Sequence, residues 1–482
     1  MGGKPKALLI NPPQKHYADS FSLNVSFPIG LMNLAASARE YCDLTILDAP
    51  ACGRRSAGGK KSLLFGAPFE SILDEISRRR PDIIGVSIPF SSQAETAVGL
   101  CRKIKNSYPD IPLVAGGAHV SVRYKHLLEN EVSDYCIPGE GENSFARFVR
   151  AYADSGNMAN TPGTASMTDG SPVLNPADFI SNLDDLPLPA YDMVDVRSYL
   201  QNPYLYNNRG ALAGPAMSIT TSRGCPFSCS FCSVGSHMGK KHRYHSPGYV
   251  MRHLELLVSR YAINKFHFED DNISLHRDRF RALMNEIIKS PMDIAWDLPN
   301  GIKADTLDPE TLADMKKAGC RELRIAIESA DQNTLTNIIR KQLDIDKAVE
   351  ILKQARRTGL RASAFYVIGF PGETVEGMKK TVDLALRMDR QYNVLPILLV
   401  ATPLYGTELY RVCSENGYIR EPVTGEDLAC GTHIMGKHLI ETPDFSPRDI
   451  DRLAAGYALR YSLNHPDRAL RKLLNRARKL FS

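Results

Sequence analysis

The sequence predicts an α/β protein with two parallel-sheet units in series, followed by a mostly helical C-terminal segment. Residues 1–150 and 216–405 each alternate short apolar runs with amphipathic stretches, a pattern typical of parallel strands covered by crossover helices. A cysteine triplet directly follows the first apolar run of the second unit. At 482 residues the chain is too long for one ordinary core, so two or three domains are expected.

The composition argues against several classes of function. A net charge of +5 is small for this length and speaks against a dedicated nucleic-acid binder. No apolar run approaches the ~20 residues that a membrane helix needs. The N-terminus passes from Lys4-Pro5-Lys6 straight into an apolar run, which indicates a first strand and not a signal peptide. Ten cysteines without a short disulfide-rich pattern suit a reducing interior, so a cytoplasmic protein is expected.

Five apolar runs in the first unit predict a parallel sheet with helices on both faces. The predicted strands are Ala7–Ile10, Asp43–Leu47, Ile83–Ile88, Leu113–Ala115 and Asp134–Ile137. The predicted helices include Ile29–Glu40, Ser71–Arg79 and Ala97–Lys105. Ligands on such sheets bind beyond the carboxyl ends of the strands. Glycines and prolines gather at those ends, and glycine lets a backbone approach a large planar or phosphate-bearing ligand closely.

Two further segments complete the predicted organisation. Residues 151–215 are rich in Pro, Asn, Asp and Gly and weakly periodic, which indicates a connector. Residues 406–482 are expected to be mostly helical. Apolar residues between Leu470 and Ala477 recur at helical spacing with Arg and Lys on the other faces, which favours a docked basic helix over a helix on a membrane surface.

Six apolar runs in the second unit predict a partial barrel that is open on one side. The predicted strands are Met217–Thr221, Lys265–Glu269, Asp293–Leu298, Glu322–Ile327, Ala362–Ile368 and Leu395–Val400. Functional residues of such a barrel are expected at the carboxyl ends of its strands. The polar and glycine-containing motifs of this unit follow its predicted strands one by one.

Cys225, Cys229 and Cys232 form a C-x3-C-x2-C triplet after the first of these strands. A complete four-iron cluster takes four cysteines, so three leave one iron open for another ligand. Zinc sites instead prefer ligand pairs at C-x2-C or C-x4-C spacing, which disfavours a zinc site here. The other seven cysteines are scattered and are expected to be mostly buried apolar residues.

The segment Thr221–Cys232 resembles the cluster loop of the radical S-adenosylmethionine enzymes, and Phe231 matches the aromatic residue before the third cysteine of that family. The resemblance implies that the three cysteines ligate one [4Fe–4S] cluster, whose open iron is chelated by S-adenosylmethionine. It also implies reductive cleavage to a 5′-deoxyadenosyl radical under anaerobic conditions. An external electron donor of the flavodoxin or ferredoxin type is then expected.

The same resemblance implies contacts to S-adenosylmethionine at the other strand ends. Carboxylates there can accept hydrogen bonds from the ammonium or the ribose diol. The implied contacts are Glu269 and Asp270 to the methionine moiety, Glu328 to the ribose, and Ile368, Gly369 and Phe370 to the adenine. For each acid alone, a solvated loop or a helix N-cap remains the alternative. Arg243, in a basic segment after the cluster loop, is left open between meeting an anionic group and lying in a solvated charge run.

The strand ends of the first unit resemble the Rossmann-like cobalamin-binding domain that precedes a radical module in one large subfamily. The matching segments are Phe27–Leu31, Pro81–Ser87, Gly116–His119 and, in the bridge, Asn182–Asp192. The expected cobalamin contacts are Pro12, Pro89, Ser91, Gly116, Gly117, His119, Gly139 and Glu140. The alternative is a domain of the same fold that has lost its ligand.

One departure from other cobalamin proteins predicts how cobalt is bound. Those that place a histidine on cobalt carry Asp-x-His-x-x-Gly, and this string is absent here. His119 lacks the required aspartate, so it is expected near the tail of the ligand and not on cobalt. A base-off cobalamin without a histidine ligand follows, and the loop Cys52–Phe65 is the expected cover of its lower face.

The two resemblances together imply an enzyme, a cobalamin-dependent radical methyltransferase that acts on an unactivated carbon. The substrate is open between a small molecule and a peptide or protein side chain, with a preference for the latter, and no catalytic side chain is assigned. The first alternative is a cobalamin-dependent radical cyclase or rearrangement enzyme. The second is a non-catalytic cobalamin-binding protein, which the intact cysteine triplet opposes.

Overall fold

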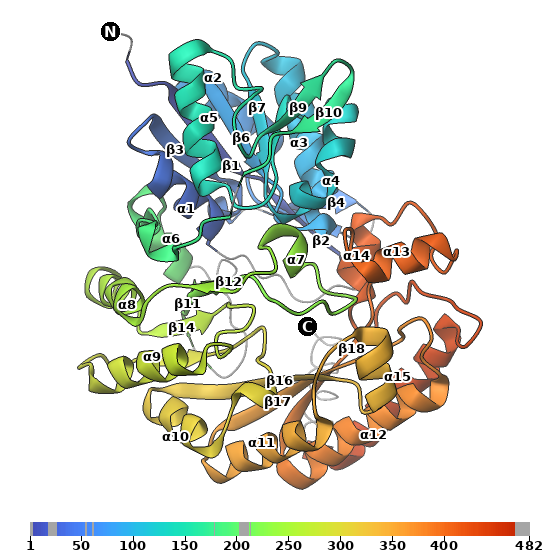
Figure 1. Ribbon diagram of the computed structural model, residues 1–482. Coiled ribbons are helices and arrows are strands. Elements are labelled where there is room, and N and C mark those ends of the chain that lie inside the picture. Colours follow the sequence, from blue (N-terminus) through green and yellow to red (C-terminus); the bar gives the residue numbers. More distant parts are fainter. Residues whose placement is uncertain are drawn as a thin grey trace, which may run out of the picture.

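The computed structural model describes residues 3–17, 27–53, 55–59, 62–177, 179–201, 212 and 214–467. Two sheet units lie one above the other in Figure 1, and the short helix α7 (Val234–His237) lies between them. Among the described residues, no helix is long and apolar enough to cross a membrane. The basic helix expected between Leu470 and Ala477 lies outside the described residues.

The sheet of the first unit contains all five predicted strands, which run parallel to one another. They are β1 (Lys6–Asn11), β3 (Asp43–Asp48), β6 (Ile83–Ser87), β7 (Leu113–Gly116) and β8 (Tyr135–Ile137). Their spatial order is β3-β1-β6-β7-β8. The chain therefore changes direction across the sheet between β1 and β6, and this switch point is where open α/β sheets bind ligands.

Helices cover both faces of this sheet because the side chains of β1 alternate between two cores. Leu8 and Ile10 pack with one set of helices, whereas Ala7 and Leu9 pack with the other. The first set is α2 (Phe69–Arg79), α3 (Ala94–Ser107) and α4 (Ala118–Glu129). The second set is α1 (Ile29–Ala38) and α5 (Glu142–Ser155). The doubly wound arrangement agrees with the prediction.

Two antiparallel features depart from the expected organisation. β9 (Ala165–Thr168) and β10 (Ser171–Leu174) form a hairpin that extends the first sheet, although this stretch was expected to belong to the connector. Separately, β5 (Ser62–Phe65) pairs with both β2 (Gln14–Tyr17) and β4 (Arg55–Gly59) in a small antiparallel sheet. The segment expected to be a covering loop after Cys52 is therefore mostly a β-hairpin.

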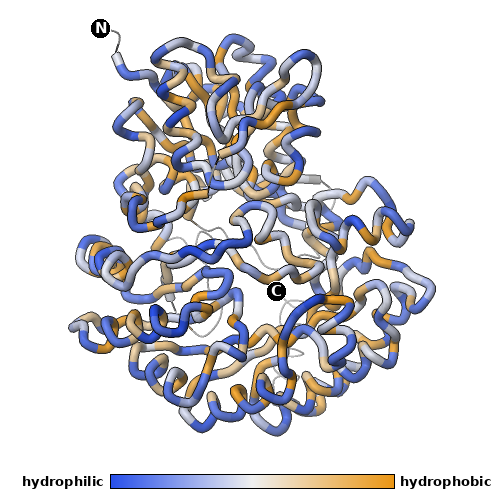
Figure 2. Tube along the Cα trace, viewed as in Figure 1, coloured by the Kyte–Doolittle hydropathy of each residue, from blue (hydrophilic) through white to orange (hydrophobic). Residues whose placement is uncertain are grey.

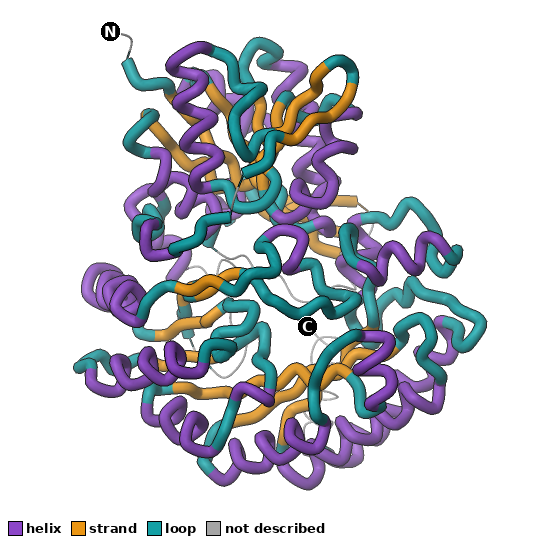
Figure 3. The backbone as a smooth tube through the Cα atoms, viewed as in Figure 1, coloured by secondary structure: helices purple, strands orange, loops and turns teal. Residues whose placement is uncertain are grey.

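The second unit has the predicted six parallel strands in chain order, with the helices on their outer side (Figure 3). The strands are β11 (Met217–Ile219), β14 (Lys265–Phe268), β15 (Ala295–Asp297), β16 (Cys320–Glu328), β17 (Arg361–Ile368) and β18 (Val394–Val400). The helices are α8 (Pro247–Tyr261), α9 (Arg277–Lys289), α10 (Pro309–Lys317), α11 (Ile345–Arg357) and α12 (Val375–Tyr392). Figure 2 shows apolar colour concentrated on the inner strands and polar colour on the outer turns of the helices. The result is the predicted partial barrel.

The described part of the C-terminal segment, residues 406–467, is mostly helical, as expected, and returns to the first unit. It contains α13 (Glu408–Glu415), α14 (Gly425–Gly431) and α15 (Pro447–Asn464). The backbone N–H of Gly425, at the start of α14, donates to the Glu95 carboxylate at 3.0 Å. A Cβ on Gly425 would lie 2.9 Å from the Ser92 carbonyl oxygen, so α14 lies directly on the loop after β6.

Candidate active site

A two-residue ribbon closes the base of the cysteine loop. β12 (Ser222–Arg223) pairs in antiparallel fashion with β13 (Arg243–Tyr244), and the residues between them carry all three cysteines of the triplet. Gly224 has φ +80°, and a Cβ there would lie 2.5 Å from the Lys241 carbonyl oxygen. This position requires glycine, because an L side chain would be both strained and in collision.

The three thiols fit an iron–sulfur cluster by their chemistry. All three cysteines are free, and burial raises the pKa of the half-buried thiols of Cys225 and Cys229. Lys341 opposes this rise in the pKa of Cys225 and Cys229. Metal binding must therefore displace protons from the sulfurs. In the described part of the chain, no three His, Cys, Asp or Glu side chains lie close enough together to bind one metal ion. The loop therefore supplies three thiol ligands, but their sulfurs do not yet point to one common centre.

The acidic pair after β14 supports the base of this loop. Asp270 is buried, and its Oδ1 accepts hydrogen bonds from Thr221 N (3.0 Å) and from the hydroxyls of Thr221 (2.9 Å) and Ser222 (2.5 Å). Asp271 Oδ2 accepts from Gly224 N at 3.2 Å. Burial raises the pKa of Asp270, and raises that of Asp271 to about 6. Asp270, predicted as a methionine contact, thus uses one of its oxygens to hold the loop.

The other predicted methionine contact lies beside it with its own partner. Glu269 Oε1 accepts from the Ser218 hydroxyl at 3.1 Å, which joins the ends of β14 and β11. Its backbone carbonyl accepts from Asn300 Nδ2 at 3.0 Å. Both acids therefore lie at the carboxyl edge of the barrel, as predicted.

Glu328, the predicted ribose contact, ends β16 in a strained conformation. Its φ is +69°, which is unusual for any residue with a Cβ, and the register of β16 with β17 shifts at this point. Lys341 Nζ donates to Glu328 Oε1 at 2.8 Å and to the Ala326 carbonyl at 2.6 Å. The strain and the ion pair together fix one carboxylate and one ammonium near the cysteine loop.

The predicted adenine segment is held by the carboxylate of Glu373, a residue that was not among the predicted site residues. Glu373 Oε2 accepts from the backbone N–H groups of Gly369 (2.8 Å) and Phe370 (3.2 Å), which follow Ile368 at the end of β17. Glu373 is buried, and burial raises its pKa to about 7. The sequence did contain a signal for this role, because Glu373 lies four residues after the strand-end Gly369, and this spacing allows a side chain to bond a nearby backbone N–H.

Phe231 connects this segment to the cysteine loop. Its ring lies 5.7 Å from that of Phe370, centroid to centroid. The aromatic residue beside the third cysteine and the predicted adenine segment thus form one apolar wall, which brings the two halves of the predicted nucleoside site together.

Two of the predicted cobalamin contacts, Pro12 and Pro89, lie at the switch point of the first sheet. A small pocket there is lined by residues after β1 and β6, including Pro12 and Pro89. His119 is buried and its Nδ1 is hydrogen-bonded to the Ser91 hydroxyl at 2.8 Å. Burial lowers the pKa of His119 to about 4, so the ring is neutral at pH 7. The ring meets Tyr405 edge-on, 6.3 Å between centroids, and Tyr405 follows the last barrel strand.

Glycines shape the rim of this site. Gly117, after β7 and Gly116, has φ +115°, and a Cβ there would lie 2.7 Å from the Ile88 carbonyl oxygen. Gly139, after β8, has φ +78°. The ends of β6 and β7 can therefore approach each other only with a bare backbone at Gly117, whereas at Gly139 it is the positive φ that favours glycine.

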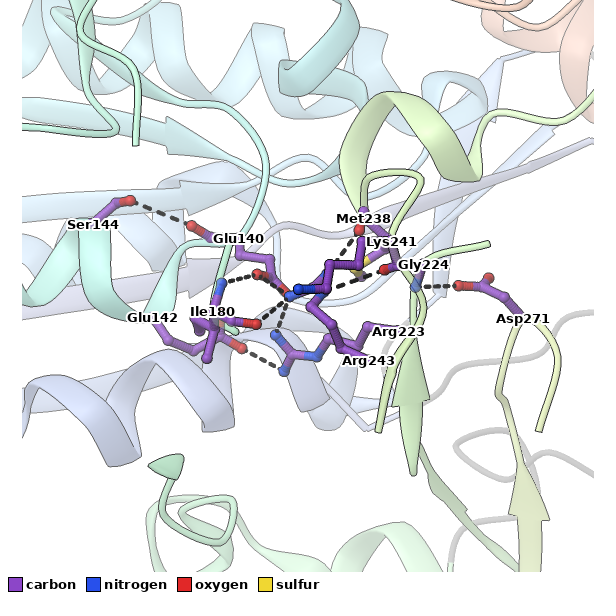
Figure 4. Close-up of polar contacts among 10 residues, drawn as sticks. All are labelled: Glu140, Glu142, Ser144, Ile180, Arg223, Gly224, Met238, Lys241, Arg243 and Asp271. Atoms are coloured by element: carbon purple, nitrogen blue, oxygen red, sulfur yellow. Dashed lines mark hydrogen bonds and ion pairs between the residues drawn. The ribbon is translucent and has the colours of Figure 1, made fainter. Parts of the chain in front are cut away.

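Glu140, the remaining predicted cobalamin contact, has different partners. Figure 4 shows its carboxylate between Arg223 and Arg243, which belong to the base of the cysteine loop. Its Oε1 accepts from Arg223 Nη1 at 2.9 Å and its Oε2 from Arg243 Nη1 at 2.7 Å. The side chain is therefore used at the interface of the two units. Arg243, left open by the sequence, is buried and meets an anionic group of the protein itself.

Comparison with known proteins identifies the family. The profile of the B12 binding domain matches residues 22–149, and that of the Radical SAM superfamily matches residues 219–385. An uncharacterised methyltransferase of Pyrococcus horikoshii is 30% identical over 417 residues, covering 86% of this chain and 84% of the relative. The cytidylyl-2-hydroxyethylphosphonate methyltransferase of Streptomyces wedmorensis is 28% identical, with the same coverage of both chains.

A solved structure has the same fold. The radical S-adenosylmethionine methyltransferase TsrM from Kitasatospora setae, solved with cobalamin and a [4Fe–4S] cluster, matches with a TM-score of 0.66 at 20% identity over 87% of this chain and 77% of that one. Fold and site together define a radical enzyme with a cobalamin domain. The chain belongs to the cobalamin-dependent radical S-adenosylmethionine methyltransferases, and its cofactors are a [4Fe–4S] cluster, S-adenosylmethionine and cobalamin. It is an enzyme, not the non-catalytic binding protein held as second alternative.

Proposed function

We propose that this enzyme methylates an unactivated carbon. The observation that supports the proposal is the buried contact between Glu140 of the cobalamin unit and the base of the cysteine loop, which holds together the two units that carry the predicted cofactor sites. When bound, the cofactors supply a hydrogen-abstracting radical on one side and a methyl group on the other. Such a carbon needs hydrogen-atom abstraction, because no side-chain base can remove its proton.

The chain's own residues have three tasks in this proposal. Cys225, Cys229 and Cys232 hold the cluster. Glu373 fixes the backbone of the adenine segment, and the wall of Phe231 and Phe370 excludes water from the nucleoside site. A water-poor site protects a reactive intermediate from side reactions. Electrons come from an external flavodoxin- or ferredoxin-type donor.

For the substrate we propose a peptide or protein side chain as the first class to assay and a small molecule as the second. The fold neighbour TsrM is described with a tryptophan substrate, an amino acid, which is compatible with both classes. The Streptomyces relative is named for a cytidylyl phosphonate, which supports a small molecule. The segment around α14, which returns to the cobalamin unit, is the part of the chain best placed to select between them.

A cyclase is the second candidate function. The anaerobic magnesium-protoporphyrin IX monomethyl ester cyclase of Rubrivivax gelatinosus is 27% identical over 347 residues, which cover 69% of this chain and 60% of the relative. A cyclase consumes S-adenosylmethionine without transferring its methyl group. The two functions therefore differ in one product, S-adenosylhomocysteine.

The deciding experiment counts products over many turnovers with candidate substrates. A methyltransferase gives one S-adenosylhomocysteine and about one 5′-deoxyadenosine for each methylated product. S-adenosylmethionine labelled at its methyl group should pass the label to substrate carbon, and substrate deuterated at the target carbon should pass deuterium to 5′-deoxyadenosine. Product formed with 5′-deoxyadenosine but without S-adenosylhomocysteine would establish the cyclase instead.

A further inference from the structure

The base of the cysteine loop contains two like charges in direct opposition. Arg223 and Arg243 are cross-strand partners in the two-residue ribbon, and both are buried. Like charges directly opposite on a ribbon destabilise it, and a buried charge without a partner is costly. Two strand residues on each side cannot offset this repulsion by themselves. The ribbon therefore needs negative charge from elsewhere.

That charge comes from the cobalamin-binding unit. Glu140, in the loop after β8, and Glu142, the first residue of α5, face the two arginines (Figure 4). Arg223 spans both acids, at 2.9 Å to Glu140 and 2.6 Å to Glu142. Arg243 pairs with Glu140 at 2.7 Å. Two positive and two negative charges are thus balanced in one buried cluster, which is the arrangement in which buried ion pairs are tolerated.

Backbone bonds fix the orientation of this cluster. Arg243 donates to the carbonyls of Met238 (2.7 Å) and Ile180 (2.8 Å), and Glu140 also accepts from Ile180 N at 2.9 Å. Met238 precedes Gly239, whose carbonyl accepts from Cys225 N at 3.3 Å. Glu140 is consequently connected to the first cluster cysteine by two short routes, one through Arg243 and one through Arg223.

We propose that Glu140 and Glu142 are positioning residues for the iron–sulfur cluster, although they belong to the cobalamin-binding unit. They neutralise the arginine pair at the base of the cysteine loop and set the loop, and with it the cluster, at a fixed distance from cobalt. The cobalamin unit is therefore part of the cluster site. This inference rests on the family's cofactors and on the proposed juxtaposition of the two sites, but it does not depend on which product is formed.

The test uses full-length enzyme loaded with cobalamin and cluster, and compares Glu140→Gln with the parent. Glutamine keeps the shape but removes the charge and turns one acceptor into a donor that faces a guanidinium. Iron release to a chelator should accelerate about tenfold or more, because one partner of a buried pair has been removed. Spin–spin coupling between cob(II)alamin and the reduced cluster should weaken or become heterogeneous. Both readouts are independent of methyl transfer, so they remain informative if the proposed function is wrong.

Two further variants separate positioning from general destabilisation. Glu75→Gln removes a half-buried carboxylate that pairs with Arg78 and Arg79 within α2, far from the cysteine loop in the sequence, and it should change neither readout. Glu142→Gln removes a single arginine contact and should give a smaller effect in the same direction as Glu140→Gln. If Glu140→Gln does not fold, Glu142→Gln carries the test alone.

A double-mutant comparison shows whether the acid acts through its arginine. The variant with Glu142→Gln and Arg223→Gln should release iron no faster than Arg223→Gln alone, within about twofold, since the ion pair of Glu142 is with Arg223 and is already broken in the single variant. So far as the acids act through their arginines, Glu142→Gln adds nothing once Arg223 is gone. Rates that multiply across the two changes would overturn the proposal. So would a folded Glu140→Gln enzyme with the parent's iron release and spin coupling.

Discussion

For single residues, the acids at strand ends form hydrogen bonds within the protein, and this is the main difference from the sequence prediction. Asp270 and Glu140 lie at the strand ends where they were predicted, but hydrogen bonds from the chain itself occupy their oxygens. A buried carboxylate must have partners, and the protein is the first source of them. Sequence position therefore predicted where each acid lies and not which group it contacts.

The cysteine triplet gives the most direct prediction. Replacing Cys225, Cys229 and Cys232 together by alanine should abolish iron loading, which should otherwise reach about four irons per chain after anaerobic reconstitution. Reductive cleavage of S-adenosylmethionine should disappear with the iron. Cys52→Ala is the matched control, because Cys52 is an exposed cysteine outside the loop and should leave loading unchanged. Full loading of the triple variant would refute the assignment.

His119 is predicted not to bind cobalt. No Asp-x-His-x-x-Gly motif accompanies it, and the partner of its Nδ1 is the Ser91 hydroxyl and not a carboxylate. Electron paramagnetic resonance of the cob(II)alamin form should therefore show no nitrogen superhyperfine splitting, and His119→Ala should leave the cobalt spectrum unchanged. A nitrogen triplet that vanishes in His119→Ala would contradict the prediction.

Glu373 should make stability depend on pH. Its pKa is about 7 in the fold against an ordinary value of 4.5, so between these values the folded chain holds a proton that the unfolded chain has lost. Stability contributed by this proton is present below pH 4.5 and is lost as pH rises to 7, by about 3 kcal/mol at most.

In Glu373→Gln the side chain cannot ionise, so this variant does not lose stability between pH 4.5 and pH 7 through this group. The unfolding free energy of the parent minus that of the variant should therefore fall between pH 5 and pH 8, as measured by urea unfolding of the cofactor-free chain. Burial raises the pKa of Asp48 and Asp271 too, but both residues are present in both proteins and cancel in the difference. A difference that stays constant with pH would show that Glu373 is ionised throughout.

At the scale of elements, the sequence predicted the parallel strands well and the antiparallel ones poorly. Each parallel strand is a continuous apolar run, because it is buried on both faces. β9 and β10 are short and partly exposed, so their runs are weak. The turn between them, Asp169-Gly170, has φ values of +49° and +76°, and Asp-Gly is a strong hairpin signal. That dipeptide could have corrected the boundary of the connector.

Gly224 tests the geometry of the cysteine loop. Gly224→Ala should weaken cluster binding strongly, because its Cβ would meet the Lys241 carbonyl at 2.5 Å and the left-handed conformation adds about 1–2 kcal/mol of strain. Gly235→Ala, in the same loop, is the matched control, since its nearest neighbour would be a flexible lysine side chain at 3.7 Å. Iron content after reconstitution measures both. Equal iron in the two variants would show that the loop adapts.

At the scale of the whole molecule, both units were predictable but their interface was not. Each sheet follows from local runs of residues, whereas Arg223 and Glu140 are 83 positions apart and meet only in the fold. From the sequence, Arg243 fitted a solvated charge run as well as a buried contact. Charge pairing across domains has no local pattern, so composition and periodicity cannot reveal it.

The interface predicts that the two units unfold together. Trp296 is the only tryptophan, lies fully buried in the barrel, and reports on that unit by fluorescence. The absorbance of bound cobalamin reports on the other unit. In the cobalamin-loaded parent the two urea transitions should coincide, as expected for one cooperative system. In Glu140→Gln the fluorescence transition and the absorbance transition should occur at different urea concentrations. Separate transitions in the parent would mean that the interface does not couple the units.

The shared ion cluster also limits how such enzymes can be recombined. A graft that joins the cobalamin unit of one protein to the radical barrel of another, cut at the connector, would divide Glu140 and Glu142 from Arg223 and Arg243. The recipient would gain two buried cations or two buried anions with no counterpart. Successful chimaeras must therefore exchange the segment from the end of β8 to the start of α5 together with the ribbon of β12 and β13, although the two pieces belong to different domains.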